Sequence, residues 1–446
     1  MTPISKAVQL LVPIALLATA GCAPGLPPPT LDTTPTGPGA ESPQPPGPLV
    51  AVSDRPRNLN PAVAPEDVRT LANSNAAFAF DLYHVLAADE GNLFFSPYSI
   101  SLALAMTYAG AAGDTASQMA GTLHFTLPPD QLHAAFNAYS LDLQARAEAD
   151  TEATPFGLSV ANSLWGQQGF GFLPEFLDLL GENYGAGMRL VDYASDPEAA
   201  RQAINQWVSD ETQEKIQDLI PSGAIDEMTR LVLANAIYFK AAWLHPFDAD
   251  VTAPAPFHRL DGSTVDVPMM HQDEGYGYAL RDGYRALELP YENGNVSMLI
   301  ILPDEGQFQA VEQALDPAMI EDILGNLTYG PVTLSLPRFT YDSAFSLNDA
   351  LQALGMTDAF NPDRADFSGM DGNRDLFIGS VLHKAFVSVD ENGTEAAAAT
   401  AVIMQITSAL AGEPIAFTVD RPFIYVIRDS QTQSVLFVGR VMAPEG

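Results

Sequence analysis

A stretch with conflicting conformational preferences, Val387–Thr407, places the strongest constraint on what this chain can fold into. It begins as a strand in which Val387 and Val389 alternate with polar residues, and a run of four alanines follows. Alanine is the best helix former, yet this run is followed by the β-branched segment Thr400–Ile403. Because the local preferences disagree, we expect a segment with more than one acceptable conformation.

The same stretch sorts its side chains by face when it is drawn as an extended strand. Glu395 and Gln405 fall on one face, and the other face carries no charge. That uncharged face consists of Thr394, Ala396, Ala398, Thr400, Val402, Met404 and Ile406. A flexible alanine-rich linker, the alternative interpretation, has no reason for such sorting, so the pattern favours a strand that can slide between existing strands.

The overall composition excludes several classes of protein. The chain has 446 residues, of which 47% are hydrophobic, so it can bury a large core. Its formal net charge of -35 argues against nucleic acid or an anionic membrane surface as a partner. Cys22 is the one cysteine, which rules out an intrachain disulfide and a cysteine-based zinc site.

The N-terminal region has the pattern of an exported protein. Residues 1–21 resemble a signal peptide, with Lys6 before the apolar run Ala7–Ala20. Small residues precede Cys22, as in the bacterial lipobox, so we expect Cys22 to be lipidated; ordinary secretion is the alternative. Residues 22–65 are rich in proline and glycine and predict a disordered tether. We therefore expect a secreted lipoprotein, at the cell surface or in the periplasm, whose folded domain spans residues 66–446.

The pattern of that domain predicts an α+β fold. Leu231–Ala242 is almost wholly apolar and predicts a buried strand, and Ser195–Glu198 marks a helix start. Asp261-Gly262 and Asn293-Gly294 predict β-hairpins, and residues 422–441 predict two strands around a polar turn. Helices dominate the first half and strands the second, without the alternation of a parallel α/β sheet.

No set of catalytic residues emerges from the sequence. It contains no Gly-x-Ser-x-Gly, no Ser-x-x-Lys, no phosphate-binding glycine loop and no His-x-x-x-His pair. The seven histidines are scattered singly, and among 55 acidic residues any chosen pair carries no weight. We therefore predict no catalytic residues, no metal site, no cofactor and no enzyme activity.

Six segments of the chain, taken together and in this order, carry a family resemblance. They are N-L-F-F-S-P-Y-S-I (Asn92–Ile100), L-A-N-A-I-Y-F-K-A-A-W (Leu233–Trp243), L-P-R-F (Leu336–Phe339), L-H-K-A-F-V-S-V-D-E-N-G-T-E-A-A-A-A-T (Leu382–Thr400), D-R-P-F-I-Y-V-I-R (Asp420–Arg428) and L-F-V-G-R-V (Leu436–Val441). Over Leu71–Pro444 the chain resembles the serpins, inhibitors that trap serine proteases. The resemblance implies three β-sheets, eight or nine helices and an exposed reactive-centre loop that can join the central sheet as a strand.

The resemblance also implies roles for individual residues. The hinge of the loop would comprise Glu391, Gly393, Thr394, Glu395, Ala396, Ala397, Ala398, Ala399 and Thr400. Counting on from Gly393 places the scissile bond between Thr407 (P1) and Ser408, and Met404, Ile406, Ser408 or Leu410 stay open as P1. Two further groups match the family: Ser96, Ser99, Asn235 and His383 as the shutter beneath the sheet, and Trp243 with Gly393 as the breach where insertion begins.

The function implied is that of a suicide substrate. A serine protease would attack the P1 carbonyl and form an acyl-enzyme, and loop insertion would then distort the protease before hydrolysis. Ile406 and Thr407 suggest an elastase- or subtilisin-like target. We expect a monomer that is held to a membrane by its lipid and binds no nucleic acid. A non-inhibitory serpin-fold carrier or chaperone and a surface solute-binding lipoprotein are the alternatives.

Overall fold

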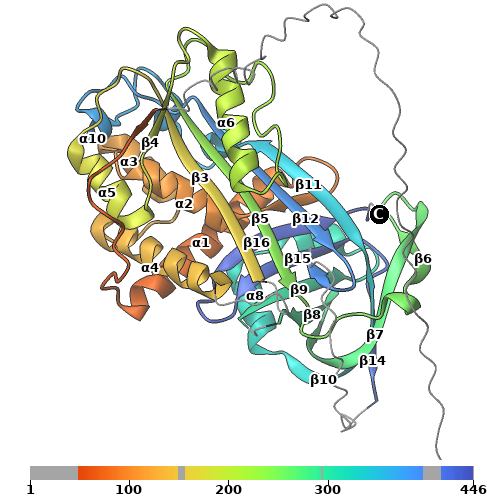
Figure 1. The fold of residues 1–446 in the computed structure, drawn as a ribbon. Helices are drawn as coiled ribbons and strands as arrows, with labels where there is room; N and C mark the ends of the chain where they lie inside the picture. The colour runs from red at the N-terminus through yellow and green to blue at the C-terminus, as the bar shows by residue number, and fades with distance from the viewer. Residues whose placement is uncertain (1–48, 149–155, 293–294, 395–412, 445–446) are drawn as a thin grey trace, which may run out of the picture. The chain divides into compact units, whose positions relative to one another are not determined.

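The computed structural model describes residues 49–148, 156–292, 295–394 and 413–444, and these form two β-sheets and ten α-helices (Figure 1). The α+β class is confirmed, and three short helices (α7, α9 and α10) bring the helix number slightly above expectation. The helices are α1 (Pro65–Leu86), α2 (Pro97–Tyr108), α3 (Gly113–Thr122), α4 (Pro129–Glu148), α5 (Pro174–Tyr184), α6 (Pro197–Glu211), α7 (Phe308–Gln313), α8 (Pro317–Gly325), α9 (Asn348–Ala353) and α10 (Ser368–Asp371), with the 3-10 turns η1 (Ala249–Val251) and η2 (Asp358–Phe360).

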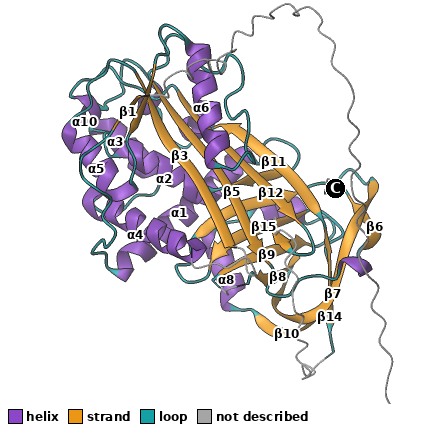
Figure 2. Cartoon of the chain, viewed as in Figure 1, coloured by secondary structure: helices purple, strands orange, loops and turns teal. Residues whose placement is uncertain are grey.

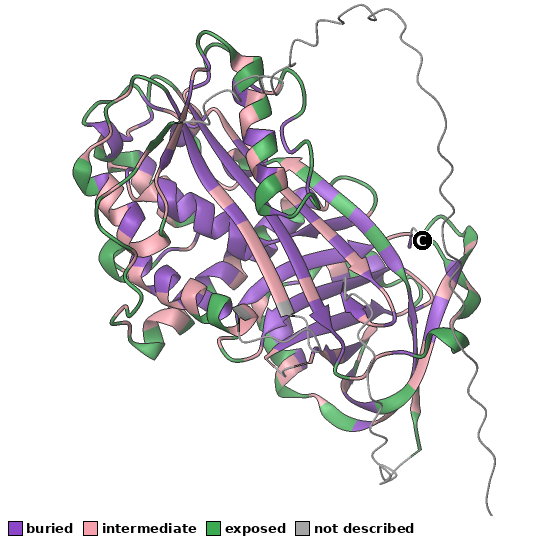
Figure 3. Cartoon of the chain, viewed as in Figure 1, coloured by how far each residue is buried: buried purple, intermediate pink, exposed green. Residues whose placement is uncertain are grey.

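The first sheet has seven strands, and the short strand β13 lies between two long strands near its centre. In spatial order the strands are β1 (Leu49–Ala51), β4 (Met188–Val191), β3 (Phe156–Gln167), β5 (Leu231–Ala242), β13 (Gly393–Thr394), β12 (Ser380–Val389) and β11 (Phe339–Ser346). β5 spans the strand that the sequence predicted and is buried along nearly its whole length (Figure 3). Its even-numbered and odd-numbered residues therefore pack against different layers.

The second sheet has nine strands because one long strand joins two groups. They are β14 (Ile415–Thr418), β10 (Thr328–Pro337), β7 (Thr264–Arg281), β8 (Tyr284–Pro290), β9 (Val296–Pro303), β15 (Phe423–Asp429), β16 (Val435–Val441) and β2 (Leu93–Phe95), with β6 (Ala253–His258) paired to β7. β7 pairs with β6 and β10 along most of its length and with β8 at its end. Two of the three expected sheets are thus continuous through β7, and both predicted hairpins are present as β6–β7 and β8–β9.

The two faces of the seven-stranded sheet are covered by different helices (Figure 2). On one face α2 is buried over almost its full length and contacts β3, β5 and the second sheet through β16. On the other face α6 packs over β3 and β5 through residues such as Ile204 and Val208. α6 begins where predicted, because the Asp196 carboxylate accepts a hydrogen bond from the Ala199 N–H (2.9 Å) and Pro197 follows it.

The folded unit begins earlier than the sequence predicted. Residues 22–65 were expected to be a disordered tether, but β1 pairs antiparallel with β4 over Leu49–Ala51. The segment that follows β1 is fixed by polar contacts: the Ser53 hydroxyl donates to Asp178 (2.5 Å) and Arg55 pairs with Glu182 (2.7 Å). The prediction was wrong for residues 49–64 because an otherwise exposed sheet edge, and not local pattern, holds them. The earlier part of the predicted tether, with the signal peptide and Cys22, lies outside the described residues.

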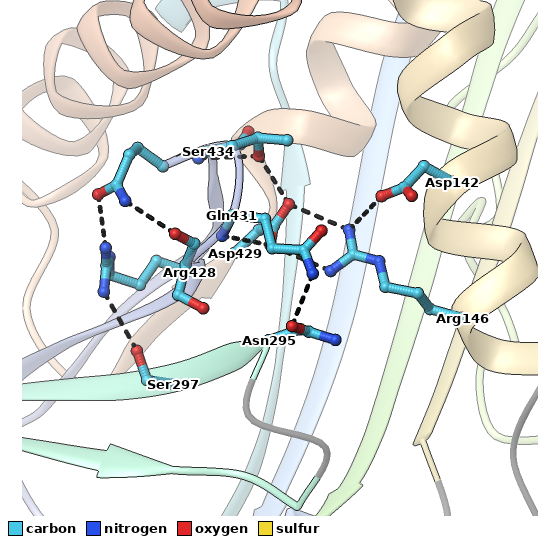
Figure 4. Close-up of polar contacts among 11 residues, drawn as sticks. Asp142, Arg146, Asn295, Ser297, Arg428, Asp429, Gln431 and Ser434 are labelled. Atoms are coloured by element: carbon cyan, nitrogen blue, oxygen red, sulfur yellow. Dashed lines mark hydrogen bonds and ion pairs between the residues drawn. The ribbon is translucent and has the colours of Figure 1, made fainter.

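A buried ion pair fastens α4 to the turn between the last two strands (Figure 4). Arg146 contacts both carboxylate oxygens of Asp429 at 3.0 Å and also pairs with Asp142 (2.7 Å). Asp429 is fully buried, and its carboxylate accepts further hydrogen bonds from the Gln431 N–H and the Thr432 hydroxyl. A buried carboxylate is tolerated when, as here, a bidentate arginine and further donors satisfy both of its oxygens.

Candidate functional site

The first residues of the predicted hinge already form a strand inside the seven-stranded sheet. β13 lies between β5 and β12: Gly393 and Thr394 pair antiparallel with Ala242 and Ala241, and Thr394 also pairs with Val389. Beyond β13, β5 and β12 pair directly with each other in parallel, over Ser380–Phe386. β13 therefore occupies one end of a junction that is closed along the rest of its length.

Gly393 is required by the close approach of β13 to β5. Its φ of +155° is one that other residues rarely adopt, and a Cβ at this position would lie 2.0 Å from the carbonyl oxygen of Ala241. The next residue, Thr394, is fully buried, and its hydroxyl lies 2.7 Å from the hydroxyl of Tyr291. The hinge is thus held in the sheet by a backbone contact that a side chain would prevent.

Trp243 holds the turn that leads into β13, at the predicted breach. Its indole N–H donates to the carbonyl of Asp390 (3.0 Å), and its backbone N–H donates to the carbonyl of Asn392 (2.8 Å). The indole stacks on Tyr291 with ring centroids 4.5 Å apart. Burial raises the pKa of the Asp390 carboxyl above its ordinary value, although the N–H groups of Asn392 and Gly393 oppose this.

Glu391, the first residue of the predicted hinge, is buried and makes polar contacts of its own. Its carboxylate accepts a hydrogen bond from the Thr252 hydroxyl (2.7 Å) and lies 3.6 Å from the guanidinium of Arg338. Its carbonyl accepts a hydrogen bond from the Phe247 N–H (2.8 Å). The chain is therefore held in place at Glu391, between β12 and β13. Any movement of the loop beyond β13 would start from this fixed point.

The predicted shutter residues converge beneath the β5–β12 junction. Asn235 of β5 and His383 of β12 lie opposite each other, and the His383 Nδ1 is hydrogen-bonded to the Asn235 Oδ1. The Asn235 amide donates to the Ser99 hydroxyl (2.6 Å), and Ser99 and Ser96 belong to the start of α2. All four residues are fully buried, so the cluster joins both central strands to the helix beneath them.

The hydrogen bonds of His383 define its protonation state. The Ser96 N–H donates to the His383 Nε2 (3.2 Å), so Nε2 carries no proton and Nδ1–H donates to Asn235. If Nε2 also carried a proton, its N–H and the N–H of Ser96 would point at each other with no acceptor between them. Burial accordingly lowers the pKa of His383 from its ordinary value of 6.5 to about 3. The cluster is therefore neutral at physiological pH.

Comparison with known proteins decides the family. The family model described as Serpin (serine protease inhibitor) matches residues 73–444. The chain belongs to the serpin family. Human leukocyte elastase inhibitor is 40% identical over 385 residues, which cover 84% of this chain and 99% of that protein. An uncharacterised serpin-like protein of Thermococcus kodakarensis is 42% identical over 84% of this chain and 86% of its own. Among solved structures, native tengpin, a thermophilic serpin, is 30% identical with a TM-score of 0.77 over 88% of this chain and 99% of its own.

Sequence reasoning missed two residues that complete these clusters. Asn162 of β3 accepts hydrogen bonds at its Oδ1 from the Ser99 hydroxyl (3.1 Å) and from the amide of Asn235. Tyr291 lies between Trp243 and Thr394 in the breach. The signal for Asn162 was an amide in the middle of a strand of otherwise small or apolar residues; Tyr291 carried no signal because an aromatic residue after a strand is ordinary.

Other parts of the predicted site lie outside the described residues. These are Glu395, Ala396, Ala397, Ala398, Ala399 and Thr400 of the hinge and Thr407 and Ser408 of the scissile bond. Within the described ranges no group of three or more His, Cys, Asp or Glu side chains could hold a metal ion. A search of the same residues for a long apolar helix of membrane-spanning character found none.

Proposed function

We propose that this serpin inhibits a serine protease as a suicide substrate, by inserting its cleaved loop between β5 and β12. The observation that carries the proposal is β13, which already runs antiparallel to both strands at one end of their junction. Beyond it the two strands meet only each other. A strand that continues β13 can therefore extend in one direction, between β5 and β12 along this junction.

The register of β13 indicates where each inserted residue would lie. Thr394 is paired with both neighbouring strands. Six residues further along the loop, Thr400 would be level with Asn235 in β5 and with His383 in β12, and these two already face each other. Because the two registers agree, a regular strand that continues β13 would pass directly through the shutter without a bulge.

The direction of the Thr394 side chain supports the same geometry. Its hydroxyl reaches Tyr291 on the core side of the sheet, and alternate residues of a strand share a face. Continued alternation would place Ala396 and Ala398 on the core side and Glu395 on the other. Small uncharged side chains can be buried at low cost, whereas an unpaired charge cannot.

The proposed reaction begins with ordinary acyl transfer. The protease serine attacks the carbonyl of P1, which we propose is Thr407, and the amine of Ser408 leaves the acyl carbon while its segment stays in the second sheet through β14, β15 and β16. Insertion then proceeds from the anchored end at Glu391 and moves the acylated protease away from its starting position. A protease stabilised by about 5–15 kcal/mol can be distorted by such a load before its acyl bond is hydrolysed.

Insertion requires the shutter to separate. The bond between His383 and Asn235 crosses the line along which β5 and β12 would part, whereas Asn235 and Asn162 lie on the paired strands β5 and β3. We infer that β3 and β5 move together and leave β12 behind. Thr400 would then stand between Asn235 and His383 with a hydroxyl that can both donate and accept.

The test is an electrophoretic assay with pancreatic elastase and with subtilisin. We expect a covalent complex that survives boiling in detergent and a released peptide whose N-terminus is Ser408. Complete turnover to cleaved protein, with full protease activity remaining, would refute inhibition and favour the carrier or chaperone alternative. The similarity to leukocyte elastase inhibitors makes an elastase-type protease the first choice.

Two hinge variants separate insertion from cleavage. Thr394→Arg places a charge where the structure has a fully buried hydroxyl, so the loop should still be cut but no longer inserted, and the inhibitor becomes a substrate. Thr394→Ser keeps the hydroxyl that reaches Tyr291 and should inhibit like the natural chain. Unchanged inhibition by Thr394→Arg would show that insertion does not follow the path of β13.

We further propose that the protein acts outside the cytoplasm as a monomer anchored through a lipid on Cys22, with residues 23–48 as the tether. The support is the small-residue run before the only cysteine. Labelling with a clickable palmitate analogue in a bacterial host should mark the natural chain and not Cys22→Ser. Equal labelling of both would exclude lipidation at this residue.

A further inference from the structure

A hollow with a volume of about 600 Å³ lies beside β3 and β4, towards the β1 edge of the seven-stranded sheet. One wall is the segment around Val52–Arg57, which follows β1, and the others come from β3, β4 and the ends of α5 and α6. None of the residues that line it belongs to β5, β12 or β13. The side chains that line this hollow are therefore not explained by the proposed insertion.

Two guanidinium groups in this hollow form no ion pair with a carboxylate in the described part of the chain. Arg57 donates only to the amide oxygens of Asn137 (2.8 Å) and Gln144 (3.3 Å). The guanidinium of Arg189 makes no hydrogen bond or ion pair with any residue in the described part of the chain; it lies 4.6 Å from the ring centre of Trp207 and 5.4 Å from that of Trp165. Burial lowers the pKa of both arginines from the ordinary value.

This lack of pairing is unusual in so acidic a chain. The sequence has 55 acidic residues against 20 Lys and Arg, so an arginine readily finds a carboxylate. Arg55, on the same wall, does so with Asp178 and Glu182. Glu211 also lines the hollow and acts on Arg189 through its charge, which opposes the lowering of the Arg189 pKa by burial, but no ion pair joins the two side chains. Two half-buried cations therefore face a shared space with unused donors, which favours an anion there.

A second hollow, of about 420 Å³, continues from the first towards α2 and α4. The two share Arg57, Asn162 and Tyr184 in their linings. The second is lined by apolar side chains, among them Leu102, Met106, Leu143 and Leu158, together with polar ones such as Ser140 and Gln144. A molecule that occupied both hollows would place a polar end at the arginines of the first and an apolar body beside the apolar side chains of the second.

We propose that these hollows form a binding site for a small monovalent carboxylate with an apolar chain, such as a medium-chain fatty acid. The carboxylate would accept hydrogen bonds from Arg57 and Arg189, and the chain would be removed from water among the apolar side chains. A dianion is disfavoured because the net charge of -35 repels it more strongly while the apolar lining gives it nothing in return.

A ligand bound in these hollows would stabilise the folded arrangement of the strands around them. It is bounded by β3 and β4 on one side and by the segment that follows β1 on the other, so a ligand would hold these parts together. Asn162 lines both hollows and is hydrogen-bonded to Asn235. A ligand that binds the folded chain and not the unfolded chain raises its thermal midpoint.

The experiment is a titration of the full folded chain with decanoate below its micelle concentration, followed by calorimetry and by tryptophan emission. Two of the three tryptophans, Trp165 and Trp207, flank Arg189, so binding should change the emission. We expect one decanoate per chain and a raised thermal midpoint. Decyltrimethylammonium, which has the same chain and the opposite charge, should not compete.

Variants identify the site. Arg189→Met should weaken decanoate binding about tenfold or more, because a charge-assisted contact is lost. Val52→Asp changes a side chain that is 61% exposed and should weaken binding by repulsion without affecting folding. Arg69→Met, at an exposed arginine on α1, should bind like the natural chain. No binding, equal binding of the cationic detergent, or unchanged affinity in both Arg189→Met and Val52→Asp would overturn the proposal.

Discussion

His383 offers a test of the shutter through the pH dependence of stability. The imidazole is buried, neutral and hydrogen-bonded at both nitrogens, and its pKa is lowered to about 3. In the unfolded chain the ordinary value of 6.5 returns. Between these two values the unfolded chain binds a proton that the folded chain does not, so stability falls as the pH falls. The stabilisation by neutral His383 is complete above pH 6.5 and is lost progressively towards pH 3.

The magnitude follows from the width of that window. Each unit of pKa difference corresponds to about 1.4 kcal/mol, so at pH 5 His383 should remove about 2 kcal/mol of stability relative to pH 8. His133 acts in the same direction, because burial lowers its pKa to about 4. The two histidines together should therefore cost about 4 kcal/mol at pH 5.

The variant His383→Gln keeps a donor and an acceptor but cannot be protonated. Its stability should fall by about 2 kcal/mol between pH 8 and pH 5, about half the change in the natural chain. The measurement is the free energy of the first unfolding transition in urea at both pH values, and His258→Gln, at an exposed position, is the control. A His383→Gln variant with the full pH dependence of the natural chain would refute the neutral, buried state that we derive for this residue.

Two further variants test contacts that the structure shows directly. Arg146→Met leaves the fully buried carboxylate of Asp429 without its cation and should lower the free energy of unfolding in urea by about 3–5 kcal/mol. Arg69→Met, in an exposed pair, should leave the urea midpoint unchanged, and equal effects of the two would contradict the account. Gly393→Ala puts a Cβ against the β5 backbone and should expel β13, seen as faster proteolytic cleavage after Thr394. The control is Gly121→Ala, whose new Cβ meets nothing within 4 Å and which should be cleaved at the natural rate. Cleavage of Gly393→Ala at the natural rate would show that β13 is not held in the sheet.

The parts of the fold that were predictable are those in which local pattern and burial coincide. β5 is buried on both faces, so its sequence is almost wholly apolar and its bounds were evident. The cap at Asp196 and the β6–β7 hairpin depend on residues that are adjacent in sequence. The residues of the shutter could be named only through the family resemblance, because a serine or a histidine in an apolar segment says nothing about its distant partner.

The parts that were missed are set by partners far away in the sequence. Val50 is exposed, as a linker residue would be. β1 forms a strand because it pairs with the free edge of β4, more than a hundred residues later. Asn162 is similar: its role depends on Asn235 and Ser99, and nothing in its own strand shows that three elements meet there. No local rule could have supplied either contact.

The hinge shows how a conflict of local preferences can coexist with a defined structure. At Gly393 and Thr394 the chain is held as a strand because glycine permits the close approach to β5 and a hydroxyl finds Tyr291. Neither reason extends to the alanine run that follows, which has no polar side chain to anchor it and no bulk to prevent its burial. The sequence thus fixes the first two residues of the strand, and the alanines that follow carry no bulk or charge that would oppose burial in the sheet. If the loop inserts as we propose, β13 is the part of the inserted strand that is already in place, and the remaining resistance lies in the β5–β12 pairing and in the bond between His383 and Asn235.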